Sequence, residues 1–231
     1  MKVSRVLALI GKEIREALRA GWANIPATAL LTVLLLVAKT PREASDAAAA
    51  LQTGLAVFLP LLAMPFYAST VLSRAIQTER LRGGFLPLFI YGGSAAEVWL
   101  GKVFGASILA YVVMLFSLGG YLGYGVWLGR DVIPPWSALP HLFVTIPVTA
   151  LSMIALQAAL FWMMGRSSLL SVIVSIVVMF GGVQVVVLLG FRPISATSAV
   201  VAMLTSCAIV AALTFAIHRF PRERAAGLAA G

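Results

Sequence analysis

Few residues in this sequence could do chemistry. Its two histidines, His141 and His218, stand at opposite ends of different apolar stretches, so they indicate no metal-ligand cluster. The single cysteine, Cys207, lies inside an apolar stretch, which predicts a packing role and excludes a disulfide within the chain. The serines of these stretches have no neighbouring base or acid, and a helical serine usually bonds to its own backbone. We therefore expect no catalytic residue and no metal site, and a chain that is not an enzyme.

Two glutamines are the remaining polar candidates inside apolar stretches. Gln157 and Gln184 each carry an amide that needs a partner in a dry environment. Two interpretations stay open: hydrogen bonds between helices, or lining of a translocation path. Gly101-Lys102 resembles the end of a phosphate-binding loop, but Ala96 stands where that loop needs glycine. The chain is thus expected to hold no cofactor, and ATP and Mg chemistry would have to come from another polypeptide.

Six long apolar stretches must position these residues. The chain has 231 residues, 61% of them hydrophobic and 11% charged, against about 25% charged in a soluble domain. None of the stretches contains Asp, Glu, Lys or Arg, and each can cross a hydrocarbon core, which needs about 17–25 residues. They are Trp22 to Ala38, Leu51 to Ser73, Val103 to Leu128, Leu139 to Met164, Leu169 to Gly190, and Thr197 to Ile217. Pro147 is expected to kink the fourth. The pattern predicts an all-α, polytopic membrane protein with six transmembrane helices.

The basic residues predict the orientation of this bundle. With the N-terminus in the cytoplasm, 13 of the 17 Lys and Arg residues fall in cytoplasmic segments, as the positive-inside rule requires. Both termini are then cytoplasmic, in a multi-pass protein of the cell membrane. The high positive charge reflects topology and contact with anionic lipid, and we expect no nucleic-acid partner. We predict one transmembrane domain over 1–231, comprising a helix over 1–21, a bundle over 22–217 and a tail over 218–231.

The first 21 residues have the pattern of an amphipathic helix. Apolar residues recur every three or four positions from Val3 to Trp22. The polar side is marked by Lys12, Glu13, Arg15, Glu16 and Arg19. Such a helix can lie in the membrane interface. Two interpretations remain: an anchor in the cytoplasmic leaflet, or an anchor whose polar face also contacts a cytoplasmic partner.

The cytoplasmic segment 74–102 has an unusual layout. Glycine pairs, Gly83-Gly84 and Gly92-Gly93, enclose a short apolar run from Phe85 to Tyr91. Ser94-Ala95-Ala96-Glu97 then has the pattern of a capping box, which predicts the start of the helix that becomes the third span. An exposed apolar run at the cytoplasmic face needs a cover, either lipid headgroups or a soluble partner. Gly101-x-x-x-Gly105, just beyond, is a close-packing motif.

This layout resembles the membrane subunit of an ABC-2-type transporter, the export class of ABC permeases, with the haem-exporter B subunit of cytochrome c maturation as a related permease of similar size. In that family the loop between the second and third spans carries an acidic-basic pair, glycine, a short apolar helix and a capped helix ending in Gly-Lys. Here the corresponding residues are Glu79-Arg80, Gly83-Gly84, Phe85 to Tyr91, Glu97 and Gly101-Lys102. The sequence departs from the pattern at Gly84 and at Leu86-Pro87, where hydroxyl and acidic residues are common.

The resemblance implies two permease subunits, in a homodimer, bound to two cytoplasmic ABC ATPase subunits that carry ATP and Mg. It also implies a coupling site in which the short apolar run enters a groove of the ATPase. The residues of that site would be Glu79, Arg80, Gly83, Gly84, Phe85, Leu86, Leu88 and Phe89. Two alternatives stand beside the permease: a membrane scaffold subunit that transports nothing, and a secondary transporter. The lack of charge inside the spans disfavours the second, because ion-coupled transporters place ionisable groups there.

Overall fold

A computed structural model describes residues 3–21, 64–79, 94–127, 139–163 and 196–219 of the chain. Every regular element in these ranges is helical, and none of the described residues forms a strand. The first and fifth expected spans lie outside them. In chain order the elements are α1 (Val3–Gly21), a helical segment over 64–79, α5 (Ala95–Trp127), the π-helical η2 (His141–Thr145), α6 (Ile146–Met163) and α8 (Ala196–His218).

Three of these helices are long and apolar enough to cross a membrane: Ala95–Tyr124 in α5, Leu142–Trp162 in η2 and α6, and Ala199–His218 in α8. They correspond to the third, fourth and sixth stretches of the sequence. The helical residues 64–79 continue the second expected stretch six residues beyond Ser73. The predicted helical fold is therefore confirmed for the described residues, which include three helices long and apolar enough to cross a membrane.

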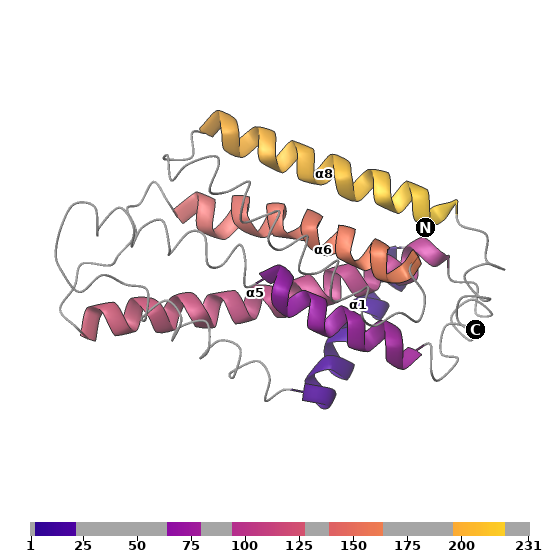
Figure 1. The fold of residues 1–231 in the computed structure, drawn as a ribbon, viewed down its shortest axis with the longest axis horizontal. Helices are drawn as coiled ribbons and strands as arrows, with labels where there is room; N and C mark the ends of the chain where they lie inside the picture. Colours follow the sequence, from indigo (N-terminus) through magenta and orange to yellow (C-terminus); the bar gives the residue numbers. More distant parts are fainter. Residues whose placement is uncertain (1–2, 22–63, 80–93, 128–138, 164–195, 220–231) are drawn as a thin grey trace.

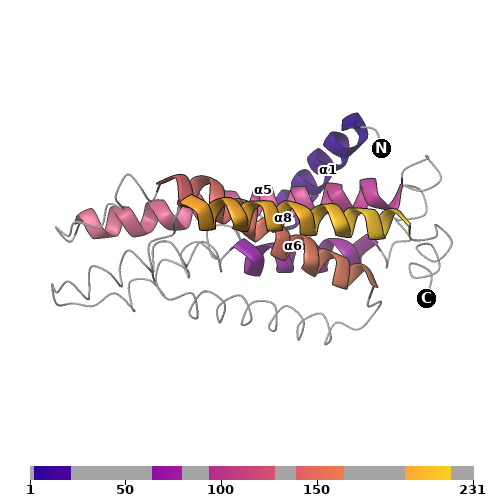
Figure 2. The ribbon, with the colours of Figure 1, turned by 90° about the horizontal axis from the view of Figure 1, so that it is seen from above.

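α5, α6 and α8 run along the long axis of the molecule, whereas α1 crosses that direction (Figure 1). The view from above also shows α1 turned away from the common direction of the three long helices (Figure 2). α5 contacts α1, α6 and α8, so it is the central element of the described part. If the three long helices stand across a bilayer, α1 lies along its surface.

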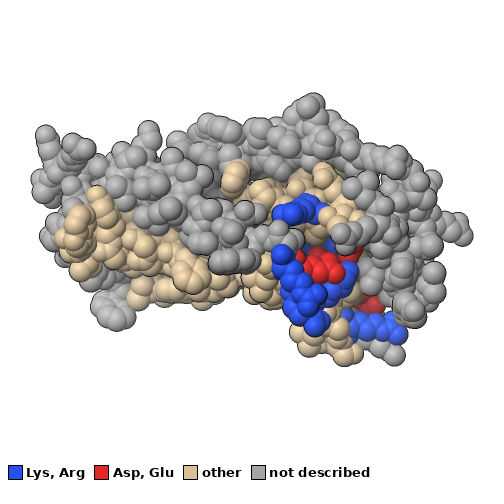
Figure 3. Space-filling view, turned by 90° about the horizontal axis from the view of Figure 1, so that it is seen from below, with Lys and Arg blue, Asp and Glu red and all other residues tan. Residues whose placement is uncertain are grey.

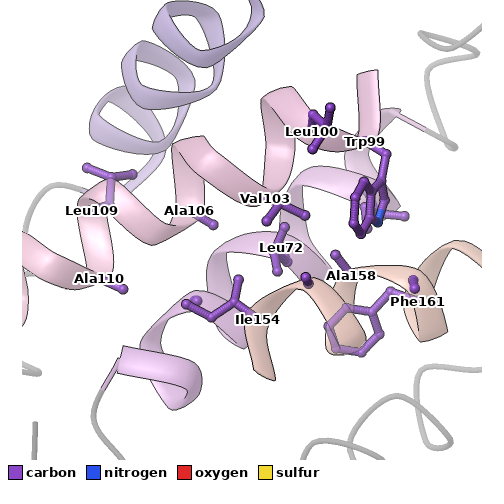
Figure 4. Packing of buried hydrophobic residues seen from close by; sticks show 14 of the residues in the cluster. Leu72, Trp99, Leu100, Val103, Ala106, Leu109, Ala110, Ile154, Ala158 and Phe161 are labelled. Atoms are coloured by element: carbon purple, nitrogen blue, oxygen red, sulfur yellow. The ribbon is translucent and has the colours of Figure 1, made fainter. Parts of the chain in front are cut away.

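The core is formed between α5, α6 and the helical residues 64–79. Trp99 and Val103 of α5, Leu72 of the segment 64–79, and Ala158 and Phe161 of α6 gather there (Figure 4). Many of its members are alanines, and those of α6 at 150, 155, 158 and 159 have no exposed surface. Small residues let helix backbones approach closely, which is how helices associate in a membrane that offers no hydrophobic drive between them.

Two local predictions about helix geometry can be compared with the structure. α5 begins at the expected capping box: the Glu97 amide donates to Ser94 Oγ at 3.2 Å, and the Ser94 amide donates to Glu97 Oε2 at 3.2 Å. Pro147, expected to kink the fourth span, directly follows the π-helical turn η2 and the first residue of α6. Proline has no N–H to donate to the carbonyl four residues earlier, so a change of helix type beside it has a physical cause.

Candidate functional site: an ion-pair network between three helices

α1 packs closely against α5 at two glycines of α5. A Cβ atom added at Gly101 would lie 2.6 Å from Leu9 Cβ, and one added at Gly105 would lie 2.8 Å from Glu13 Cβ. Both distances are too short for real side chains, so α1 approaches α5 as closely as it does only because these positions are glycine. The Gly101-x-x-x-Gly105 motif is therefore a packing site, and its partner is the crossing helix α1.

Four charged side chains meet beside this contact. Lys102 Nζ of α5 lies 2.9 Å from Glu13 Oε1 of α1 and 2.8 Å from Glu79 Oε2. Lys12 Nζ of α1 lies 2.6 Å from Glu79 Oε1, the other oxygen of the same carboxylate. We call these four residues, Lys12, Glu13, Glu79 and Lys102, the ion-pair network. It joins α1, the end of the helical segment 64–79 and α5.

The network is buried and balanced in charge. The Lys102 side chain is 1% exposed, and those of Glu13 and Glu79 are each 8% exposed, whereas Lys12 reaches the surface at 34%. Two ammonium groups face two carboxylates, so no net charge is taken out of water. Burying ions is costly, and a pair of this kind survives only when each charge keeps a close partner.

Burial and the neighbouring charges shift the pKa values of Glu13 and Lys12, the two network residues on α1. Burial raises the pKa of the Glu13 carboxyl above its ordinary 4.5; the Lys102 ammonium opposes that change and the Glu79 carboxylate adds to it. For Lys12, burial acts to lower the pKa, but the hydrogen bond and the charge of Glu79 outweigh it and raise the pKa above 10.5. At neutral pH the lysine is therefore held firmly in its charged form.

Further charged groups surround the network. Glu16 Oε1 lies 3.8 Å from Lys12 Nζ, and Arg5 Nη1 lies 4.0 Å from Glu97 Oε2 in the capping box. Carboxylate oxygens of Glu13, Glu16 and Glu79 come within 4.8 Å of one another. Two lysines already serve this group as counter-ions, so the grouping does not point to a metal site. Figure 3 shows acidic side chains enclosed by basic ones in one region, with other described residues, which carry no charge, beside it.

The structure describes only part of the predicted coupling site. Glu79 is in the network, whereas Arg80, Gly83, Gly84, Phe85, Leu86, Leu88 and Phe89 lie outside the described residues. On α1, Lys12 joins the network, and Arg15, Glu16 and Arg19 are exposed as expected of a polar side. Glu13 differs from the prediction: it is buried in the contact with α5, on the same face as Val6 and Ala17.

The sequence pattern does not show that Lys102 is a buried partner of two acids. A usable signal was the position of Lys102, between the capping box and an uninterrupted apolar stretch, in a helix that had already begun. Glu13 carried a similar signal, because it lies three positions after Ile10 and four before Ala17, on one helix face. Neither pattern specifies a partner about 90 positions away in the chain.

Gln157 is 1% exposed, on α6. Its Oε1 atom accepts no hydrogen bond within the part of the chain that the structure describes. This oxygen therefore gives no support to the first of the two interpretations, a hydrogen bond between helices, and Gln184 lies outside the described residues.

The network has a defined place relative to the predicted loop. Glu79 is the residue just before Arg80, and Lys102 stands one helical turn beyond the capping box that follows the loop. The Lys102–Glu79 pair therefore closes the base of that segment, and Lys12 and Glu13 fasten the closed base to α1.

No protein-family model matches the chain, and no curated protein matches it as a relative.

Proposed function

We propose that the chain is the membrane-spanning permease subunit of an ATP-driven exporter of the ABC-2 type. It forms the translocation path, and its driving force enters through the loop between the second and third spans. Three apolar helices support a membrane location, and the layout of the sequence supports the transporter class. The distribution of the basic residues supports a location in the cell membrane with both termini cytoplasmic.

The observation that carries this proposal is the Lys102–Glu79 pair at 2.8 Å, bonded on both sides to α1. A loop that only connects two helices needs no buried ionic brace at its base, since most such connections lie on the surface and tolerate change. A loop that must deliver a push needs a stiff base. Short contacts between buried, oppositely charged groups supply that stiffness.

In the proposed mechanism, the apolar run Phe85 to Tyr91 docks into a groove of a cytoplasmic ATPase. The ATPase subunits would hold ATP and Mg and would supply the driving force, and their closure would displace the docked run. The ion-pair network passes that displacement to α5, and α1 moves with α5 because they meet at Gly101 and Gly105. A second copy of the permease completes the path, and an amphipathic substrate passes between the two copies.

The decisive experiment is co-purification of the full chain with candidate ABC ATPases of the same organism. We expect a stable complex and stimulated ATP hydrolysis, and we expect both to be lost when Phe85, Leu88 and Phe89 are replaced by aspartate. The matched control is Gln77→Asp, which adds charge at an exposed position on the preceding helix. Unchanged complex formation and stimulation in the triple variant would overturn the proposal.

The same preparation separates the two alternatives. A scaffold subunit would bind a partner but show no nucleotide-dependent change in crosslinking between cysteine pairs placed across the two copies. A secondary transporter would accumulate substrate in vesicles from an ion gradient without any ATPase. A permease would show a nucleotide-dependent change in crosslinking, and it would not accumulate substrate from an ion gradient without an ATPase.

A further inference from the structure

The surface of α1 that faces away from α5 divides into two parts. Residues of an α-helix are spaced by about 100°, so Val3, Leu7 and Leu18 fall within about 60° of one another. They are 69%, 62% and 39% exposed, and they form an apolar stripe that the other described residues leave largely uncovered. Arg15 lies beside this stripe, about 60° from Leu18, and Arg19 lies about 40° further round the helix. Both arginines are exposed. The Arg15 side chain turns back along the helix, and its Nε donates to the Gly11 carbonyl at 3.1 Å.

The direction of α1 matches a membrane surface. It crosses the direction shared by α5, α6 and α8 (Figures 1 and 2). It also crosses α5 at a definite depth, at Gly101 and Gly105. From Gly105 to Trp127 the helix advances 22 residues, a rise of about 33 Å, close to the roughly 30 Å thickness of a hydrocarbon core.

Aromatic residues at the far end of α5 support this depth of α1 relative to the bilayer. Trp127 is 77% exposed, and its ring lies 5.9 Å from that of Tyr124. Exposed tryptophan and tyrosine collect where hydrocarbon meets headgroups. With these rings at one boundary of the bilayer, Gly105 and α1 fall at the other boundary.

The positions of the basic residues round α1 agree with this location of the helix at the bilayer boundary. With the apolar stripe toward the hydrocarbon, Arg5 and Lys12 fall on the opposite side of the helix, by the same 100° spacing. Their partners Glu97 and Glu79 are there. Arg15 and Arg19 fall between the two sides, at the level of the headgroups. Long arginine side chains next to an apolar stripe reach phosphate groups while their stems stay in apolar surroundings.

We propose that this outer surface of α1 binds anionic phospholipid. The stripe of Val3, Leu7 and Leu18 enters the acyl boundary, and Arg15 and Arg19 pair with headgroup phosphates. The surface selects anionic over zwitterionic lipid, because a basic residue near a membrane surface gains about 1 kcal/mol from anionic lipid. The inference requires membrane insertion only, not transport, and can be tested without any ATPase.

The test uses the full chain in lipid nanodiscs. Cys207 is the only cysteine, so a Cys207→Ala background allows one label to be placed at Leu7→Cys, Leu18→Cys or, as control, Glu16→Cys. We expect brominated lipid to quench a fluorescent label at the first two positions, and iodide in solution to quench the label at Glu16→Cys. Quenching by iodide alone at Leu7→Cys and Leu18→Cys would overturn the proposal. Protection of these labels from both quenchers would also do so, since a protein would then cover the stripe.

Lipid selectivity is measured with the same labels in equal mixtures of brominated phosphatidylglycerol and phosphatidylcholine. We expect a preference for phosphatidylglycerol that falls about fivefold for each of Arg15→Gln and Arg19→Gln. Arg74→Gln, an exposed arginine outside α1, should leave it unchanged, and Arg15→Lys with Arg19→Lys should retain it. An unchanged preference in the double glutamine variant would contradict the assignment, and co-elution with wild-type protein in size-exclusion chromatography verifies its fold.

Discussion

Lys102 Nζ lies 2.8 Å from Glu79 Oε2, although 22 residues, 80–101, separate the two in the chain. The Lys102 side chain is 1% exposed, and its buried ammonium also lies 2.9 Å from Glu13 Oε1. Removing one member of a buried ion pair leaves the other without a partner, which is far more costly than replacing the whole set. The stability of the three-helix junction therefore depends on this one lysine.

Lys102→Met is expected to destabilise the protein by about 3–5 kcal/mol. The substitution keeps much of the side-chain volume but leaves the carboxylates of Glu13 and Glu79 in a buried site without Lys102. Thermal unfolding in detergent measures the effect. The triple variant Lys102→Met, Glu13→Gln and Glu79→Gln should recover much of the loss, because no uncompensated carboxylate remains. A triple variant as unstable as the single one would contradict the electrostatic explanation.

Gly105→Ala and Gly101→Ala should each separate α1 from α5. The new methyl group would lie 2.8 Å from Glu13 Cβ in the first case and 2.6 Å from Leu9 Cβ in the second. We expect a loss of about 1–3 kcal/mol from overpacking, with faster hydrogen exchange in α1.

The control for this pair is on the same helix. At Gly119 and Gly123 an added Cβ meets nothing within 4 Å, and alanine is favoured over glycine in a helix by about 1 kcal/mol. Gly123→Ala should therefore be neutral or stabilising. If Gly101→Ala, Gly105→Ala and Gly123→Ala all changed the stability by the same amount, the close α1–α5 contact would not be the cause of the loss.

Several of these features follow from the sequence, and others do not. Apolar length placed α5, α6 and α8, and the spacing of Ser94 and Glu97 predicted the start of α5, because both are local properties of the chain. The partner of Gly101-x-x-x-Gly105 and the pairing of Lys102 with Glu13 depend on which helix crosses α5. Nothing local to residues 101–105 encodes the approach of residues 9–13, so tertiary contacts of this kind required the structure.

The pKa of Glu13 predicts a specific dependence of stability on pH. Burial raises this pKa above 4.5, so the folded state binds a proton more tightly than the unfolded chain. The resulting stabilisation is complete below pH 4.5 and is lost as pH rises through the raised value. The unfolding temperature of the wild type should therefore fall relative to that of Glu13→Gln as the pH rises above about 4.5. A difference that stayed constant with pH would contradict the raised pKa.

Two substitutions in the capping box distinguish the contribution of its hydrogen bonds to stability from that of the Glu97 charge. Ser94→Ala removes the acceptor for the Glu97 amide and should cost about 1 kcal/mol. Glu97→Gln keeps a side chain that can bond the Ser94 amide but loses its charge beside Arg5, which lies 4.0 Å away and is partly exposed. We expect the glutamine variant to unfold close to the wild-type temperature, and the alanine variant to unfold earlier.

Glu79→Gln tests whether the ion-pair network transmits force, and this prediction rests on the proposed permease function. The variant loses both ion pairs of Glu79, with Lys12 at 2.6 Å and Lys102 at 2.8 Å, but keeps the Lys102–Glu13 pair that seats α1 on α5. We therefore expect the chain to fold and to bind its ATPase, while substrate transport per ATP hydrolysed falls by roughly tenfold or more, as a coupling free energy above about 1.4 kcal/mol implies. Glu16→Gln is the matched control, because Glu16 also faces Lys12, at 3.8 Å, but is 55% exposed. Equal coupling in the two variants would show that the base of the loop is a passive connection; loss of ATPase binding in Glu79→Gln alone would place Glu79 in the docking surface instead.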